Sequence, residues 1–469
     1  MNIDTKGIEA IVKKVMDTID VAEESGKPVV DGENGLFQDM NNAIDAAHAA
    51  WKNYMVQPLA LRYKIIQAIR DIMMKKENAE TICHMAVEET GMGNYEDKLT
   101  KQYLVSSRTP GMEDLAADCW TGDDGLTLLE LSPFGVIGAM CPTTNPNETI
   151  INNSIGMLAA GNAVVFAPHP KAIKTSIYCV KLINKAIKAA GGPENLVVTT
   201  EHPTMESADL MMHHPKVRML CATGGPGVVN AVLSSGKKAI GAGAGNPPAL
   251  VDETANIEQA AKDIIDGCCF DNNLPCIAEK EVVVVDQVAD YLIFNMKKHG
   301  AFEIKDRDVI DNLAAMVAPD GRVSRDYVGK SAKYIAKAAG IEVPDDTRVL
   351  ICEAPSSHPL VQIELMMPIL GIVRVDNVDE GIDLACDLEH GNRHTAMMHS
   401  KNVDKLTEMS KKIQTTIFVK NGPSYAGLGV GGEGYPTFTI AGPTGEGLTS
   451  AKSFARRRRC VLCKGFDIK

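Results

Sequence analysis

The chain has 469 residues, of which 45% are apolar and 23% are charged, and its formal net charge is −12. This length exceeds what one ordinary hydrophobic core supports and predicts two large domains. The acidic balance argues against nucleic acid as a partner, because phosphate binding needs a basic surface. No apolar run reaches the roughly 18 residues of a membrane helix, so we expect no membrane partner either.

Residues 1–27 predict an amphipathic helix and a linker. Their apolar residues recur at helical spacing, and the polar stretch Glu23–Asn34 follows them. Such a helix either docks on its own domain or binds a partner as a peptide, and the pattern leaves both open. Because the segment lacks the features of a secretory signal, we expect a cytoplasmic protein. The apolar face consists of Ile8, Ile11, Val12, Val15, Met16 and Ile19.

The twelve cysteines favour reduced thiols over a disulfide framework, since their spacing is irregular. Cys460 and Cys463 form a single C-x-x-C motif that has neither a second pair nor a nearby histidine. A structural zinc ion needs about four such ligands, so we expect no metal.

Residues 28–245 predict a nucleotide-binding domain. Helical patterns cover Phe37–Gly91, and from Phe134 onward short continuous apolar runs alternate with helical segments. Continuous runs indicate a parallel sheet with both faces covered, and the alternation is typical of a doubly wound, Rossmann-like domain. The expected strands are Phe134–Cys141, Ala163–Ala167, Leu196–Val198, Val217–Cys221 and Ala239–Ile240, and the expected helices are Glu148–Ala160, Ile173–Ala190, Ser207–His213 and Gly227–Ser235.

Residues 246–440 predict a second α/β domain. The glycine-rich stretch Gly241–Pro248 interrupts the first pattern, and a new series of apolar runs follows it. Residues 441–469 then form a C-terminal segment that contains the basic run Arg456–Arg459. The strands expected in the second domain are Glu281–Asp286, Arg348–Cys352, Ile372–Val375, Thr395–His399 and Thr415–Val419.

Two short motifs are candidates for chemistry. Thr223, Gly224, Gly225 and Gly227 follow an apolar strand and precede a helix, where backbone amides bind phosphate well, although a tight turn without ligand needs the same glycines. Cys276 lies in the loop segment Asp271–Cys276, where nucleophiles often occur and where asparagine side chains could stabilise an oxyanion. Sequence spacing alone does not distinguish a reactive thiol from an inert one.

Several ordered segments resemble the aldehyde dehydrogenase superfamily, in particular its coenzyme A-acylating branch, from about Leu36 to Leu462. The resemblance identifies Cys276 as the catalytic cysteine and leaves Cys268 and Cys269 as structural residues. It also implies a small arm that interrupts the first domain at about residues 120–131 and combines with residues 441–469 into an oligomerisation sheet of a homodimer or homotetramer. The matching segments are Ser132–Gly138, Pro142–Pro146, Ala160–Val165, Gly241–Pro248 and Phe270–Glu279.

Two departures from the hydrolytic branch of this family bear on the reaction. The hydrolytic enzymes carry a glutamate that activates water where this chain reads Ala242–Gly245, so a thioester on Cys276 should persist until a thiol attacks it. The segment Phe166–His169 lacks the lysine that commonly holds the adenosine ribose, which suggests a differently shaped nucleotide pocket containing His169.

The resemblance therefore implies a reversible oxidation of a short aldehyde by NAD, with coenzyme A as the acyl acceptor. Asn145 and the backbone amide of Cys276 are the expected oxyanion donors, with Thr144 as the alternative to Asn145. Thr143, Thr144, His169 and the Thr223–Gly227 turn are expected to bind cofactor. Glu364 matches the glutamate that holds the nicotinamide ribose in a Glu-x-x-x-Pro motif.

Two other functions remain open at this stage. One is a hydrolytic aldehyde dehydrogenase that forms a carboxylic acid, against which the missing glutamate argues. The other is cargo of a bacterial microcompartment, in whose lumen residues 6–19 would bind a shell protein. The second role is compatible with the acylating reaction.

Overall fold

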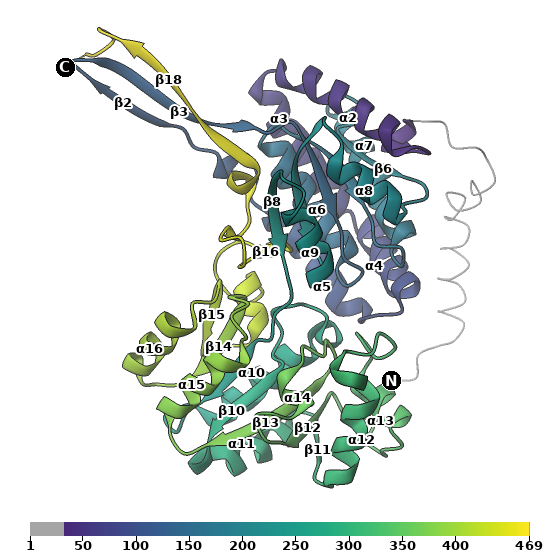
Figure 1. The fold of residues 1–469 in the computed structure, drawn as a ribbon, viewed down its shortest axis with the longest axis vertical. Coiled ribbons are helices and arrows are strands. Elements are labelled where there is room, and N and C mark those ends of the chain that lie inside the picture. Colours follow the sequence, from purple (N-terminus) through teal and green to yellow (C-terminus); the bar gives the residue numbers. More distant parts are fainter. Residues whose placement is uncertain (1–31, 469) are drawn as a thin grey trace.

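The computed structural model describes residues 32–468, and the amphipathic segment predicted over Ile8–Ile19 lies outside them. Two parallel sheets flanked by helices form the body of the molecule, and a narrow antiparallel sheet projects from it (Figure 1). Among residues 32–468 there is no helix long and apolar enough to cross a membrane. The same residues contain no group of three or more His, Cys, Asp or Glu side chains that could hold a metal ion.

The first sheet has six parallel strands, and its central strands are unbroken apolar runs because helices cover both faces. All five strands predicted for this domain are present, with bounds shifted by a few residues. Only the two-residue edge strand at its start was not anticipated. In spatial order the strands are β1 (Leu36–Phe37), β6 (Val197–Thr200), β5 (Ala163–Ala167), β4 (Val136–Met140), β7 (Val217–Thr223) and β8 (Lys238–Ala242).

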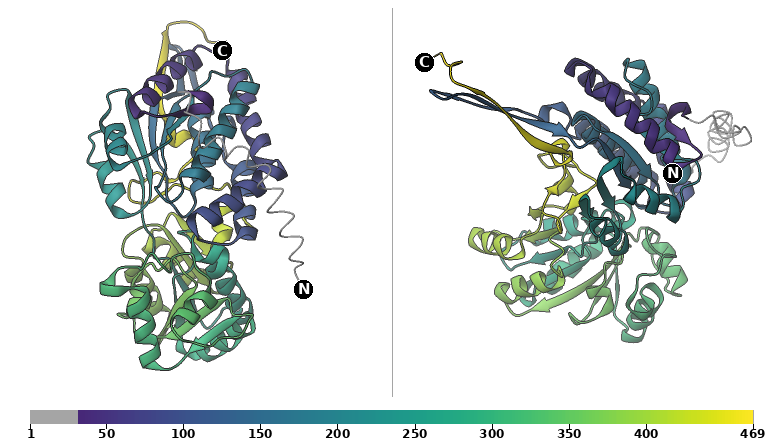
Figure 2. Two further views of the ribbon diagram at one scale, coloured as in Figure 1. Left: turned by 90° about the vertical axis from the view of Figure 1, so that its right-hand side faces the viewer. Right: turned by 45° about the horizontal axis from the view of Figure 1, so that its top comes forward.

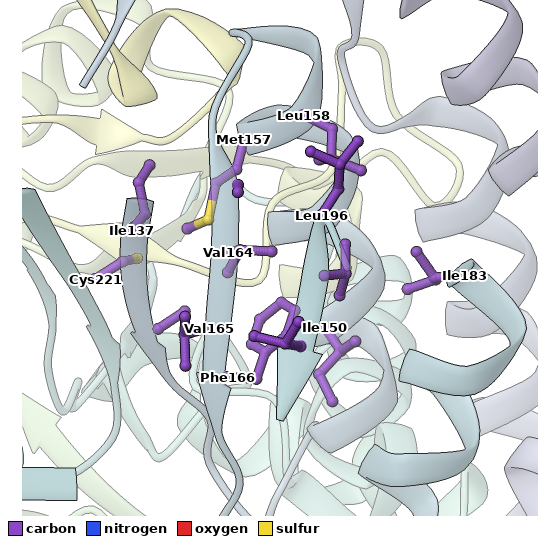
Figure 3. Packing of buried hydrophobic residues seen from close by; sticks show 14 of the residues in the cluster. Ile137, Ile150, Met157, Leu158, Val164, Val165, Phe166, Ile183, Leu196 and Cys221 are labelled. Carbon is purple, nitrogen blue, oxygen red and sulfur yellow. The ribbon is translucent and has the colours of Figure 1, made fainter. Parts of the chain in front are cut away.

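The core of this half lies between the sheet and its helices. Figure 3 shows Val164 and Phe166 on the strands, with Ile183 on a neighbouring helix. Each of these side chains is fully buried, which stabilises the fold by about 1.5–3 kcal/mol per side chain. The helices are α2 (Met40–Met55), α3 (Leu59–Met74), α4 (Lys76–Thr90), α5 (Tyr95–Arg108), α6 (Pro146–Ala159), α7 (Ile173–Ala189), α8 (Met205–His213) and α9 (Pro226–Leu233).

The second sheet has seven parallel strands, and the five predicted ones are again present. Pro248 begins one of the two unpredicted strands, a position that tolerates proline because no ladder hydrogen bond from its nitrogen is needed there. The other, Ala301–Ile304, is a short edge strand that contains a glutamate. The spatial order is β11 (Ala301–Ile304), β12 (Val349–Glu353), β13 (Ile369–Val375), β10 (Glu281–Val285), β9 (Pro248–Val251), β14 (Thr395–His399) and β15 (Ile417–Lys420).

Amphipathic helices cover this second sheet, and several begin at asparagine caps that the sequence supplies. Asn377, for example, accepts hydrogen bonds from the backbone N–H groups of Asp379 and Glu380. The helices are α10 (Ile257–Cys269), α11 (Asp286–Lys298), α12 (Arg307–Val317), α13 (Ala332–Ala338), α14 (Pro359–Gln362), α15 (Val378–Leu388) and α16 (Val403–Ile413).

The projecting sheet corresponds to the arm expected near residues 120–131. Strands β2 (Asp118–Gly122) and β3 (Gly125–Pro133) form a hairpin, and β18 (Ala455–Cys463) pairs with β3 along its whole length. Figure 2 shows this sheet extending away from both halves of the molecule. Arg456–Arg459 are exposed on it or partly so, whereas Phe454 is buried in its own chain beside Gly156 of α6. A small antiparallel pair, β16 (Ile440–Ala441) with β17 (Gly447–Leu448), precedes β18 in the chain.

The domain boundaries that the sequence predicts at residues 28, 246 and 441 stay a prediction.

Candidate active site

The connectivity of the first sheet marks the place where a ligand should bind. The chain passes from β4 to β5 and β6 on one side and then returns to β7 and β8 on the other side of β4. Ligands of open parallel sheets bind at such a switch point, beyond the carboxyl ends of the strands. The segments that follow β4, β5 and β7 contain all the residues predicted from the first domain, so they share one edge of the sheet.

The turn after β7 presents an open helix N-terminus. Thr223 ends the strand, Gly225 caps α9, and Gly227 lies in its first turn. A Cβ atom on Gly225 or Gly227 would meet nothing within 4 Å, and on Gly224 it would only touch Val228 at 4.0 Å. Free amides at a helix start attract anions, so this turn can accept a phosphate group.

The segment after β4 contains Thr143, Thr144 and Asn145. The hydroxyl of Thr143 is buried without a hydrogen-bond partner in the chain, which leaves it available to a ligand. Asn145 caps α6 by position and is 7% exposed. Its Nδ2 donates to Thr144 Oγ1 at 3.3 Å, and its Oδ1 accepts from the buried Lys101 Nζ at 2.5 Å.

His169 follows β5 at the same edge. Its Nδ1 accepts a hydrogen bond from the backbone N–H of Lys171 at 3.1 Å, so this nitrogen is used within its own turn. Burial lowers the pKa of His169, and the nearby charges of Arg325 and Lys171 lower it further. The imidazole is therefore neutral at pH 7 and offers a cofactor only its second nitrogen.

The loop that carries Cys276 has an unusual backbone. Asp271, Asn272 and Asn273 all adopt left-handed conformations, which asparagine and aspartate tolerate better than other residues with a side chain. Asn273 Nδ2 donates to the carbonyls of Cys268 and Glu279 at 2.9 Å each. Asn272 Nδ2 donates to the carbonyl of Gly329 at 2.9 Å. These two amides thus hold the loop in shape, and the expectation that they stabilise an oxyanion is not supported.

Cys276 is partly exposed, whereas six of the other cysteines are buried. Burial of its sulfur raises the pKa of Cys276 to about 12, with a further contribution from Glu364, while Lys280 and Lys101 oppose the rise. The sulfur is therefore a neutral thiol in this state. Its reaction as a nucleophile needs a proton acceptor close by.

Two ionisable side chains, those of Glu364 and His394, lie next to Gly245. Glu364 accepts a hydrogen bond from the Gly245 N–H, and burial raises the pKa of Glu364 to about 7, against the effect of Lys280. A Cβ on Gly245 would lie 2.9 Å from the His394 ring and 3.2 Å from the Cys276 carbonyl, so glycine is required there. Burial lowers the pKa of His394 to about 4, and its Nε2 has no partner in the chain. Sequence reasoning missed His394, because a single histidine at the start of a strand gave no signal.

Residues 11–434 match the aldehyde dehydrogenase family. The chain belongs to this family. It is 48% identical to the CoA-propanoylating propanal dehydrogenase of Salmonella typhimurium over 471 residues, which cover 100% of both chains. The two α/β halves and the projecting sheet are the aldehyde dehydrogenase fold, as predicted.

Solved structures of similar enzymes agree with this assignment. Propionaldehyde dehydrogenase of Rhodopseudomonas palustris with bound propionyl-CoA is 61% identical, with a TM-score of 0.90 over 92% of this chain and 95% of that one. Another structure of that enzyme contains CoA and an acylated cysteine. A propionaldehyde dehydrogenase from the fucose utilisation microcompartment of Clostridium phytofermentans is 54% identical, with a TM-score of 0.91 over 93% of this chain and 100% of that one.

Two variants of the Clostridium phytofermentans enzyme have also been solved, one with a histidine and one with a cysteine replaced by alanine. The two replaced positions are as far apart in that sequence as Cys276 and His394 are in this one.

Proposed function

We propose that this chain is a CoA-acylating aldehyde dehydrogenase that converts a short aldehyde, CoA and NAD reversibly into the acyl-CoA and NADH. The observation that carries the proposal is Cys276, in a loop that Lys101 links to Asn145 after β4, with no carboxylate in Ala242–Gly245. Full-length similarity to an enzyme named for CoA-propanoylation supports it.

The residues at the sheet edge fit a dinucleotide. The open N-terminus of α9 can receive a phosphate, and the unpartnered hydroxyl of Thr143 can bond to a polar group of the ligand. Glu364 accepts a hydrogen bond from the Gly245 N–H and interacts with Cys276, and it is the expected partner of the nicotinamide ribose. Bound NAD supplies the hydride acceptor, and CoA supplies the thiol that takes the acyl group.

The chain's own groups perform the remaining steps. Cys276 loses its proton to a nearby base, for which the Glu364 carboxylate with its pKa of about 7 is suited, and its sulfur adds to the aldehyde carbon. The backbone amide of Cys276 and the Nδ2 group of Asn145 donate to the resulting oxyanion. After oxidation an acyl thioester remains on Cys276. It persists because Ala242–Gly245 offers no carboxylate to activate water.

The test is NADH formation from propanal and NAD, with and without CoA, by the wild type and by Cys276→Ala. We expect turnover only with CoA and only with Cys276 present. Cys269→Ala is the matched control, because Cys269 lies on α10 and bonds to Arg348 instead of facing the sheet edge. Steady NADH formation without CoA would mean that water accepts the acyl group.

The N-terminal segment is the basis of a second proposal, that the enzyme works in the lumen of a bacterial microcompartment and binds a shell protein through residues 6–19. The apolar spacing of Ile8–Ile19 supports it, as does similarity to an enzyme from such a compartment. A truncation that removes Met1–Gly26 should keep full CoA-dependent turnover and lose encapsulation with shell proteins. Loss of turnover in the truncated enzyme would contradict a purely targeting role.

A further inference from the structure

Helix α5 contributes two lysines to the interior behind the active site. Lys98 and Lys101 are both 0% exposed, although lysine is almost never fully buried without a charged partner. Both ammonium groups pair with the Asp271 carboxylate, Lys98 at 3.2 Å and Lys101 at 2.7 Å. Asp271 lies in the loop that leads to Cys276, so each lysine reaches from α5 to the catalytic loop.

Lys101 differs from Lys98 in its other contacts. Its Nζ donates to Asn145 Oδ1 at 2.5 Å and forms a second ion pair with Glu148 Oε1 at 2.9 Å, so it is held by one amide oxygen and two carboxylates. Burial opposes its charge, but the carboxylates of Asp271 and Glu148 outweigh this effect and hold the pKa of Lys101 above its ordinary value. Lys101 is therefore a permanent cation.

This cation fixes which way the Asn145 amide points. An ammonium group can only donate hydrogen bonds, so the oxygen of Asn145 must face Lys101 and its NH₂ group must face away. The NH₂ group reaches Thr144 Oγ1 at 3.3 Å, on the side of the sheet edge. Without the ammonium, the amide could turn by 180° and present its oxygen, which would repel an oxyanion instead of stabilising it.

We propose that Lys101 is a positioning residue that holds the Asn145 amide in the donor orientation required at the oxyanion. Its ion pair with Asp271 also fixes the position of this amide relative to the Cys276 loop. The proposal rests on the function proposed above and on Asn145 as an oxyanion donor. Lys101 lies on α5, far in the sequence from both Asn145 and Cys276. Its single buried charge contacts Asn145 on one side and the Cys276 loop, through Asp271, on the other.

Lys101→Met and Lys98→Met are the matched pair that tests it. Both changes remove a buried ammonium from Asp271. The first also releases the Asn145 side chain, whereas the second releases only a long 3.5 Å hydrogen bond to the backbone carbonyl of Thr144. One oxyanion donor is worth about 10²- to 10³-fold in kcat, so we expect Lys101→Met to lose at least about tenfold in kcat with the KM for NAD unchanged. Lys98→Met should stay within about threefold of wild type. Equal losses in both variants would overturn the proposal.

A double-mutant cycle with Asn145→Ala separates positioning from general damage. If Lys101 acts through Asn145, the double variant should have the kcat of Asn145→Ala alone. If Lys101→Met slows the Asn145→Ala enzyme by the same factor as it slows the wild type, Lys101 does not act through this amide and the proposal is wrong. CoA-dependent turnover of the wild type is measured in the same assay, so a failure of the proposed function would be seen separately.

Lys101→Gln replaces Lys101→Met in these experiments if the methionine variant does not fold. Glutamine keeps an uncharged N–H donor for Asn145 Oδ1, and it should retain more of the wild-type kcat than methionine does. In this case the cycle is run with Lys101→Gln, and additivity with Asn145→Ala would again contradict the positioning role.

Discussion

Two carboxyl groups near Cys276 have pKa values well above the ordinary value for glutamate. Glu364 and Glu279 both have pKa values raised to about 7 by burial, and each lies within a few residues of a motif that the sequence displays. Glu364 accepts a hydrogen bond from Gly245, which lies next to Cys276. Glu279 instead accepts hydrogen bonds from the Ser424 N–H at 2.8 Å and from the Ser424 Oγ at 2.7 Å. These bonds oppose the rise in the pKa of Glu279 without cancelling it.

Glu279 should make stability depend on pH. Its pKa is raised from an ordinary 4.5 to about 7, so between these values the native state holds a proton that the unfolded state has lost. Stability therefore falls as pH rises through this window, by about 3 kcal/mol at full ionisation. Glu279→Gln should show a smaller drop in Tm between pH 5 and pH 8, measured by calorimetry. The exposed Glu253→Gln should keep the wild-type dependence, and an equal drop in both variants would refute the effect.

At the scale of single elements, α9 is the clearest link between a sequence motif and a ligand. It is a short helix, Pro226–Leu233, whose first turn is open to solvent, and Gly225 at its cap has an extended backbone that any residue can adopt. The glycine is thus not required for the turn itself, and open space for an anion is the better reason for its presence.

Gly225→Asp should separate helix stability from ligand binding. Aspartate is a good N-cap and complements the helix dipole, so Tm should hold or rise. Its carboxylate would occupy the space of the phosphate and repel it, and we expect the KM for NAD to rise at least tenfold. Gly225→Asn gives the same cap without the charge and should raise the KM much less. Equal KM values for the two variants would show that charge at this cap does not matter.

At the scale of the whole molecule, the arm sheet of β2, β3 and β18 projects into solvent, and nearly all residues of β2 and β18 are exposed. Trp120, Val461 and Leu462 are each at least 50% exposed on it. The register places Trp120 and Val461 on either side of Thr127, so the two side chains share one face of the sheet. An exposed apolar row of this kind favours contact with another subunit, in line with the predicted homodimer or homotetramer.

The combined change Trp120→Glu and Val461→Glu should reduce the oligomer to smaller species, because it places two negative charges in that row. Light scattering after size-exclusion chromatography measures the mass. Met205→Glu changes an even more exposed apolar residue on α8, outside the arm, and should leave the mass unchanged. A mass unaffected by the arm substitutions would mean that the subunits associate elsewhere.

The sequence by itself determined ten of the thirteen strands of the two parallel sheets and the helices α6 to α9, because continuous apolar runs and helical periodicity are local properties. It missed β1, β9 and β11, which are short or begin with a proline. Ordered motifs also identified the family and Cys276. The tertiary structure alone decided which distant side chains meet. Lys101 and His394 carry no local signal, and Asn272 and Asn273 looked like oxyanion donors until their hydrogen bonds to the backbone were seen. The physical reason is that burial and hydrogen-bond partners, which fix charge and orientation, depend on contacts between residues far apart in the chain.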